Sequence, residues 1–127
     1  MRRVTGIGGI FLKAADPTAL GAWYRTHLGL DMQEWGGAAL AWNEPADTGT
    51  EGMTLFTLFR ADSAYFPGAC MVNFRVPDLD ALVAALRAEG CAVDERVELS
   101  EYGRFGWVTD PEGNRIELWQ PPASSPG

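Results

Sequence analysis

Two stretches of the chain share one order of apolar and polar positions. Residues 9–25 (GIFLKAADPTALGAWYR) and residues 71–87 (MVNFRVPDLDALVAALR) align without a gap. In each stretch the apolar positions first alternate, as in a strand, and then recur at helical spacing after an aspartate. Asp16 and Asp78 hold this same place, and each can cap the first turn of a helix. The pattern therefore predicts a duplicated strand–helix module.

The two predicted helices each have an apolar stripe and a glycine at the end. Pro17 follows Asp16 at the first helical position, where its missing N–H costs no hydrogen bond. Gly29 and Gly90 can end the helices in a left-handed turn. The stripes consist of Leu20, Trp23, Tyr24 and Leu28 in the first helix, and of Leu79, Leu82, Val83 and Leu86 in the second.

After each helix the apolar period changes toward two, which predicts three further strands per module. They lie near residues 32–35, 38–42 and 53–59, and near residues 92–98, 105–109 and 115–119. Asp110–Asn114 reads as a hairpin turn, residues 43–52 as a loop and residues 60–68 as a linker. The predicted fold class is α+β. One domain, residues 1–127, contains two tandem βαβββ modules, about 4–62 and about 68–121, and a flexible tail at 122–127.

Alternation along three strands sorts their side chains onto two faces of a sheet. The aliphatic rows should lie beneath the helices: Ile10, Leu12, Ala14, Val72, Phe74, Val76, Ile116 and Leu118. The opposite face then carries Phe11, Lys13, Met71, Asn73, Arg75, Arg115, Glu117 and Trp119. Two interpretations of this mixed face stay open. It is either a solvated face with charge pairs such as Arg75 with Glu117, or a pocket with apolar walls and a few converging polar groups.

Charge and composition exclude several classes of function. The 127 residues include 10 basic and 17 acidic side chains, a net charge of −7, which argues against a nucleic-acid partner. No apolar run is long enough to span a membrane, and none follows Met1-Arg2-Arg3 as a signal peptide would require. Cys70 and Cys91 lack metal-site spacing, so two buried, reduced thiols are expected. We therefore expect a cytoplasmic protein.

Two segments resemble the glyoxalase/bleomycin resistance/dioxygenase superfamily, also called the vicinal oxygen chelate fold. The first is the opening strand with Asp16, Trp23, Tyr24 and the sequence LGL at 28–30. The second is VTDPEGNRIEL at 108–118. The resemblance covers residues 7–121 and implies a curved mixed sheet around a pocket. It does not imply one function, because the superfamily includes lyases, isomerases, ring-cleaving dioxygenases and drug-sequestering proteins.

The resemblance also implies where a metal would bind. Members typically use a His in the first strand, a carboxylate in a middle strand, a His in the strand that opens the second module, and a Glu in the last strand. The corresponding positions here are Gly9, Phe56 or Thr57, Met71 and Glu117. Only Glu117 is a metal-binding residue type, and the one histidine, His27, lies near the end of the first predicted helix. We therefore expect no metal ligands and no cofactor.

Two functions from different classes remain. The first is a metal-free binding protein that resembles the resistance members, with an aromatic or oxygenated small molecule as its ligand. Its stacking surfaces would be Trp35, Trp42, Trp107 and Trp119, about half of which should instead fill the core. Acidic residues would favour a cationic ligand.

The second function is a metal-independent lyase or isomerase acting on a small keto or carboxylate metabolite, with Glu117 as general base. An anionic intermediate would be stabilised by Lys13, Asn73, Arg75 or Arg104. Residues 98–105 form a rim, or else a plain polar hairpin, and carry Ser100, Glu101, Tyr102 and Arg104. The predicted ligand-binding set is Phe11, Lys13, Met71, Asn73, Arg75, Tyr102, Arg104, Trp107 and Trp119. The resemblance also implies a homodimer.

Overall fold

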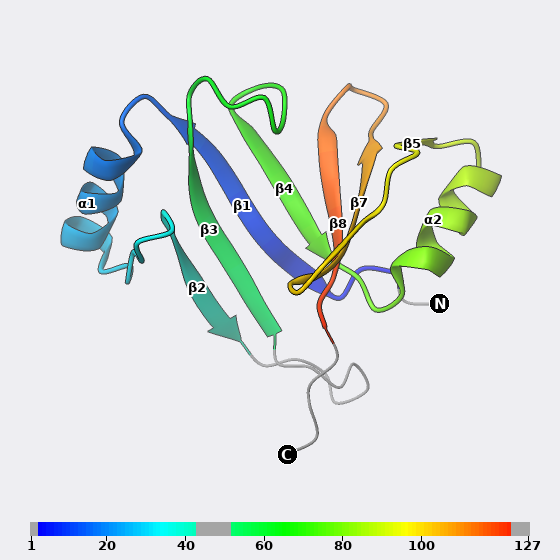
Figure 1. Cartoon of the computed structure of the whole chain (residues 1–127), viewed down its shortest axis with the longest axis horizontal. Helices are drawn as coiled ribbons and strands as arrows, with labels where there is room; N and C mark the ends of the chain where they lie inside the picture. The colour runs from blue at the N-terminus through cyan, green and yellow to red at the C-terminus, as the bar shows by residue number, and fades with distance from the viewer. Residues whose placement is uncertain (1–2, 43–51, 123–127) are drawn as a thin grey trace, which may run out of the picture.

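The computed structural model describes residues 3–42 and 52–122 (Figure 1). The first half of the chain forms β1 (Gly6–Ala14), α1 (Pro17–Leu28), β2 (Gly37–Trp42) and β3 (Gly52–Arg60). The second half forms β4 (Cys70–Arg75), α2 (Leu79–Ala88), β5 (Ala92–Val93), β6 (Glu98–Ser100), β7 (Gly103–Thr109) and β8 (Arg115–Gln120). The predicted α+β class is confirmed, with two helices and one mixed eight-stranded sheet.

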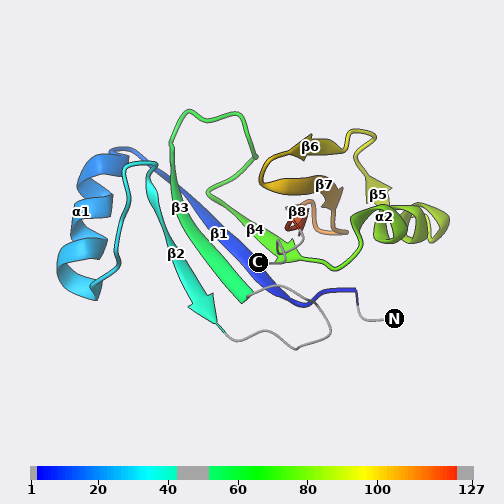
Figure 2. The same cartoon turned by 60° about the horizontal axis from the view of Figure 1, so that its bottom comes forward.

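The two halves join edge to edge in that sheet. The strand order is β2-β3-β1-β4-β8-β7-β5, with β6 paired to β7. The duplication is visible in the pairing, since β1 runs parallel to β3 and β4 runs parallel to β8. The two opening strands, β1 and β4, pair antiparallel at the centre. The helices lie at opposite ends of the molecule, α1 beside the first half of the sheet and α2 beside the second (Figures 1 and 2).

Both helices begin and end at the predicted residues. The side chain of Asp16 accepts from the Ala19 N–H at 3.0 Å, and that of Asp78 accepts from the Ala81 N–H at 3.1 Å. Past the ends of the helices, Gly29 and Gly90 have φ of 70° and 81°, the left-handed region in which glycine has no Cβ penalty.

Three apolar clusters confirm the predicted division of the sheet into two faces. Leu79, Leu82 and Val83 of α2 form one cluster with Val76 and Leu118, and Phe74 and Ile116 pack against it. Under α1 lie Met32, Ala38 and Leu58, packed against Leu12, Leu20 and Tyr24. The third cluster is on the opposite face and consists of Phe11, Phe66, Met71 and Trp107.

Two predicted strands are wrong. Residues 32–35 form a turn instead, because Gly36 has a φ of 96° and its N–H bonds to the Gln33 carbonyl at 3.0 Å. Residues 92–98 do not form one strand but contribute the short β5 and the first residue of β6. The side chain of Asp94 accepts from the Arg96 N–H at 2.9 Å, and this local turn interrupts the ladder. The predicted loop at 43–52 lies outside the described residues except for Gly52, and the predicted tail lies outside them from residue 123.

Several apolar side chains lie on the surface. Cys70 and Cys91 are both exposed, so the prediction that they are buried was wrong. Cys70 is the first residue of β4, and Cys91 lies in the turn between α2 and β5. In the predicted stripe of α1, Trp23 and Leu28 are exposed.

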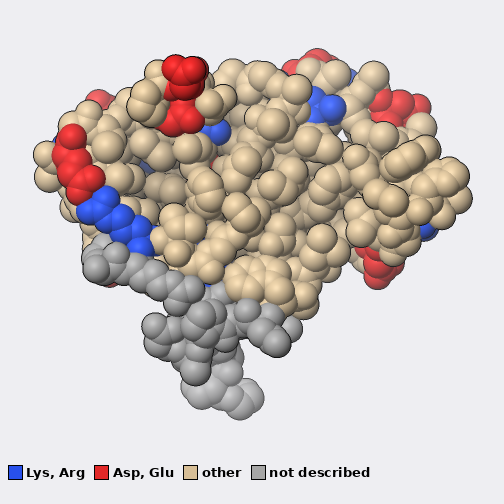
Figure 3. Space-filling view, turned by 180° about the vertical axis from the view of Figure 1, so that it is seen from behind, with Lys and Arg blue, Asp and Glu red and all other residues tan. Residues whose placement is uncertain are grey.

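Seen from behind, the middle of the described surface is uncharged and the charged side chains lie toward its margins (Figure 3). Neither described helix has the length and apolar character that a membrane span requires.

Candidate functional site

A cavity of about 800 Å³ lies on the face of the sheet opposite the helices. Both halves of the chain build it. The first half contributes Phe11, Trp35, Met53, Leu55, Thr57 and Phe59. The second half contributes Asn73, Glu101, Tyr102, Phe105, Glu117, Trp119 and Pro122, and Tyr65 comes from the linker between β3 and β4. Most of the wall is aromatic or aliphatic, so the cavity has the composition of a small-molecule site.

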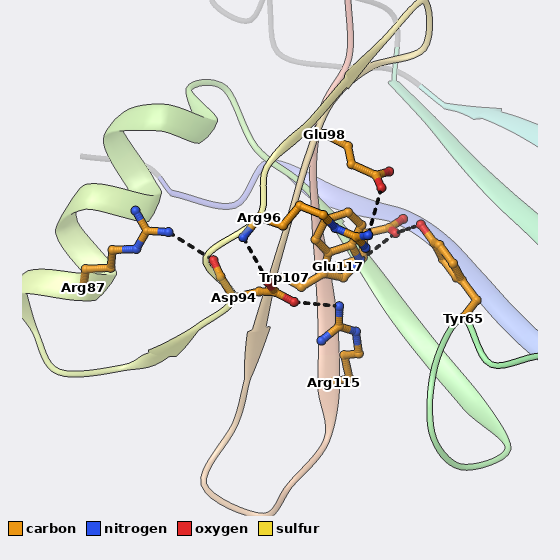
Figure 4. Close-up of polar contacts among 8 residues, drawn as sticks. All are labelled: Tyr65, Arg87, Asp94, Arg96, Glu98, Trp107, Arg115 and Glu117. Atoms are coloured by element: carbon orange, nitrogen blue, oxygen red, sulfur yellow. Dashed lines mark hydrogen bonds and ion pairs between the residues drawn. The ribbon is translucent and has the colours of Figure 1, made fainter.

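Glu117 is the buried charged group of this cavity. Its side chain lies on β8 and the residue is only 1% exposed. Oε1 accepts from Asn73 Nδ2 at 2.7 Å. Oε2 accepts from Trp107 Nε1 at 3.0 Å and from the Tyr65 hydroxyl (Figure 4). Burial raises the pKa of Glu117, and these three hydrogen bonds oppose that rise. The carboxylate is therefore held by donors from three different segments.

Asn73 orients Glu117 and carries a free acceptor of its own. The sheet register pairs Asn73 on β4 with Glu117 on β8. The amide nitrogen is used by Glu117, whereas Oδ1 is buried and accepts no hydrogen bond from the residues that the structure describes. A buried acceptor without a donor is costly. This acceptor lies in the packed interior beside Gly8 and not on the cavity surface.

Tyr65 was not predicted as a site residue. It lies in the linker, where its ring stacks on Phe59 with centroids 5.6 Å apart and planes 12° apart. Burial and the hydrogen bond to Glu117 raise the pKa of Tyr65, so its hydroxyl stays protonated and remains a donor. The available signal was the aromatic pair Tyr65-Phe66 within an otherwise small and polar linker, since an apolar pair in a loop indicates packing against the core.

Five of the ten predicted site residues line the cavity. Phe11, Asn73, Glu117 and Trp119 lie on its floor, and Tyr102 lies at the tip of the β6–β7 hairpin. The hairpin is tied to the floor because Trp119 Nε1 donates to the Tyr102 carbonyl at 2.8 Å. Residues 98–105 are thus both a hairpin and part of the wall, through Glu101, Tyr102 and Phe105.

The other five predicted residues lie away from the cavity. Met71 and Trp107 are buried in the aromatic cluster that supports it. The Lys13 ammonium lies 4.9 Å from the centre of the Phe66 ring, and the Arg75 guanidinium lies 5.9 Å from the centre of the Trp42 ring. Arg104 forms an ion pair with Asp80 at 3.1 Å. Of the four tryptophans proposed for stacking, Trp35 and Trp119 line the cavity, while Trp42 and Trp107 do not.

The residues at the superfamily's metal positions do not fit a metal ion. Any side chain added at Gly9 would begin with a Cβ only 2.7 Å from the Phe11 ring. Met71 is 1% exposed in the aromatic cluster, and both oxygens of Glu117 accept hydrogen bonds. Within the described residues, no three His, Cys, Asp or Glu side chains come together as a ligand set.

Fold and cavity together define a duplicated α+β scaffold with a buried glutamate at the position where the superfamily resemblance implies a metal ligand. The sequence model of a family described as the glyoxalase-like domain matches residues 9–119. The chain therefore belongs to the glyoxalase-like domain family. No curated protein matches the sequence significantly.

Solved structures agree with this assignment. A variant of the methylmalonyl-CoA epimerase from Streptomyces coelicolor, in complex with 2-nitronate-propionyl-CoA, is 25% identical, with a TM-score of 0.68 over 97% of this chain and 99% of that one. The methylmalonyl-CoA epimerase from Mycobacterium tuberculosis is 22% identical, with a TM-score of 0.65 over 96% and 91% of the two chains. A glyoxalase/bleomycin resistance protein/dioxygenase superfamily member from Vibrio splendidus 12B01 is 13% identical, with a TM-score of 0.60 over 91% and 98%. The last two likenesses show the fold alone.

Proposed function

We propose that this protein is a metal-independent binding protein for a small aromatic compound that carries a cationic or hydrogen-bond-donating group. The observation that carries the proposal is the buried carboxylate of Glu117 in a cavity with aromatic walls. The volume of about 800 Å³ suits a ligand of drug or metabolite size. Aromatic faces and a carboxylate together favour a flat molecule with a positive or donor-bearing end.

The charges around the cavity support a donor or a cation over an anion. Among the described residues that line it, the ionisable side chains include Glu101 and Glu117 but no Lys or Arg. Lys13, Arg75 and Arg104, which favoured an anionic ligand in the sequence, contact Phe66, Trp42 and Asp80 instead.

A second candidate is a metal-independent isomerase that abstracts a proton next to a carbonyl group, with Glu117 as base. Burial raises the pKa of Glu117, which suits a general base, and an epimerase structure is 25% identical to this chain. Against it, three donors already engage the carboxylate, so a substrate must first displace one of them. We therefore place binding first.

A matched set of compounds with a single benzene ring tests the proposal. Benzylamine, benzyl alcohol and benzoate share one ring and differ in charge, and their binding is measured by calorimetry and thermal shift. We expect the amine to bind in the main cavity and to shift the indole N–H of Trp119 in NMR spectra, and benzoate not to do so. Glu117→Gln should weaken amine binding at least about tenfold and alter alcohol binding by less than about threefold. The control is Glu112→Gln, which removes the same charge from an exposed turn. Equal binding of benzoate, or no effect of Glu117→Gln, would overturn the proposal.

Hydrogen exchange separates the two candidates. Keto and thioester forms of the ligands that bind are incubated in D₂O, and deuterium incorporation at the carbon next to the carbonyl is followed by NMR. Incorporation by the wild-type protein that is lost in Glu117→Gln would establish proton abstraction by this carboxylate. Tight binding without incorporation supports a binding protein.

A further inference from the structure

A second cavity, of about 410 Å³, lies on the other side of Tyr65. It is bounded by the linker residues Ala64 and Pro67, by Arg96 between β5 and β6, by Thr109 at the end of β7 and by Arg115 at the start of β8. Tyr65 lines both cavities, so one tyrosine side chain forms their common wall. The first cavity contains carboxylates and the second contains guanidinium groups, which makes their preferred ligands opposite in charge.

The two guanidinium groups are held by Trp107. The guanidinium carbon of Arg96 lies 4.8 Å from the centre of the Trp107 ring, and that of Arg115 lies 5.4 Å from it (Figure 4). Trp107 itself is only 1% exposed. Cation–π contact and the buried ring fix both groups on one side of the cavity. The register places Thr109 directly beside Arg115, so its hydroxyl belongs to the same wall.

Each guanidinium group has one carboxylate partner and keeps unused donors. Arg115 Nη2 contacts Asp94 Oδ2 at 3.1 Å, and Arg96 Nη1 lies 3.4 Å from Glu98 Oε1. Over the described ranges 3–42 and 52–122, the remaining guanidinium nitrogens of both residues have no hydrogen-bond acceptor. Guanidinium N–H groups match the oxygens of phosphate and carboxylate. The carboxylate partners reduce the local positive charge, so affinity for a lone anion should be modest.

We propose that this second cavity binds an oxyanion of the phosphate or carboxylate class, held between Arg96 and Arg115 with the Thr109 hydroxyl as a third donor. The oxyanion is either a free anion or the acidic end of a molecule that extends past Tyr65 into the main cavity. Both sources present the same oxygens to the same donors, and the probes below distinguish them. The anion site itself does not depend on the function proposed for the main cavity, and only a ligand that extends past Tyr65 involves both cavities.

Inorganic phosphate at constant ionic strength, balanced with chloride, is the first probe. The indole N–H of Trp107, assigned with Trp107→Phe, and the Nε–H of Arg115 report binding in ¹⁵N-correlated NMR spectra. We expect saturable shifts with a dissociation constant on the order of millimolar. Arg96→Gln and Arg115→Gln should each weaken binding at least about fivefold. Arg3→Gln, which removes the same charge from an ion pair with Glu89 outside the cavity, should change it by less than about twofold.

Phenyl phosphate is the second probe. Affinity close to that of phosphate identifies a free oxyanion, whereas binding about tenfold tighter with a shift of the Trp119 indole identifies a ligand that reaches both cavities. If Arg115→Gln fails to fold because it leaves Asp94 unpaired, Arg96→Gln still tests the site, since its ion pair is the more exposed one. No saturable shift of Trp107 up to about 20 mM phosphate, or equal weakening by Arg3→Gln, would overturn the proposal.

Discussion

Replacing Tyr65 with Phe tests whether the donors around Glu117 stabilise a charged carboxylate. The substitution removes one hydroxyl and keeps the ring that stacks on Phe59. A hydrogen bond to an ionised group contributes about 1.5–3 kcal/mol. Tyr65 is 40% exposed, so water can replace part of the lost contact. We expect the free energy of unfolding to fall by about 1–2 kcal/mol at neutral pH.

The loss should depend on pH because the missing donor stabilises only the ionised form of Glu117. Burial already raises the pKa of Glu117 above its ordinary value of 4.5, and loss of the Tyr65 donor raises it further. The pKa in the unfolded chain does not change. A carboxyl whose pKa is raised by folding lowers stability as the pH rises through the folded-state pKa, and it has no such effect below the unfolded-state pKa. The difference between variant and wild type should therefore be largest above the folded-state pKa of Glu117 in the variant, and should shrink as the pH falls through the folded-state pKa values toward 4.5.

Urea unfolding at a series of pH values from about 5 to 8 measures this difference. The control is Tyr102→Phe, since Tyr102 is 67% exposed and its hydroxyl makes no hydrogen bond to a described residue. The control should stay within about 0.5 kcal/mol of the wild type at every pH. A loss in Tyr65→Phe that is constant over the pH series, or one no larger than in the control, would refute the reasoning.

Three further predictions concern the fold and the assembly. Gly103→Ala should cost at least about 2 kcal/mol in urea unfolding, because φ is 119° and a Cβ would lie 2.2 Å from the Gln120 carbonyl oxygen. The control is Gly68→Ala, since Gly68 has a φ of 76° and no atom lies within 4 Å of an added Cβ; it should cost only about 1 kcal/mol. If both substitutions lowered stability equally, a clash at Gly103 would not be the cause. Asp78→Ala should cost about 1 kcal/mol in thermal melting by circular dichroism, because the Ala81 N–H loses its acceptor. Sedimentation equilibrium should show a homodimer, and a monomer at every concentration would contradict the prediction.

The ends of the helices could be predicted from the sequence because the residues that determine them are close together in the chain. Asp16, Asp78, Gly29 and Gly90 act within one helical turn, so the ends of both helices follow from the sequence. Alternation was likewise enough to sort the faces of β1, β4 and β8. The predicted strand at 32–35 failed because Gly36, directly after it, has a positive φ, and Gly36-Gly37 was the signal that should have been read as a turn.

Alternation along the strands predicts which side chains share the inner face of the sheet, but not which of them contact one another. It places Asn73 and Glu117 on the inner face, but the pairing of the two residues is a matter of sheet register, which alternation does not determine. It also places Lys13 on that face, where the linker's Phe66 then draws the ammonium away from the cavity. Tyr65 reaches Glu117 across 52 residues of sequence, and no periodic pattern in the linker encodes that contact.

The packing of Gly9 against Phe11 limits which substitutions could introduce a metal ligand. A histidine introduced at position 9 meets the ring of Phe11, so it gains no ligand geometry unless Phe11 changes as well. Even then Glu117 remains engaged by Asn73, Tyr65 and Trp107. A metal ligand introduced at position 9 is therefore not enough to build a site of the kind that the superfamily resemblance implies. Phe11 and the donors around Glu117 would have to change together with it.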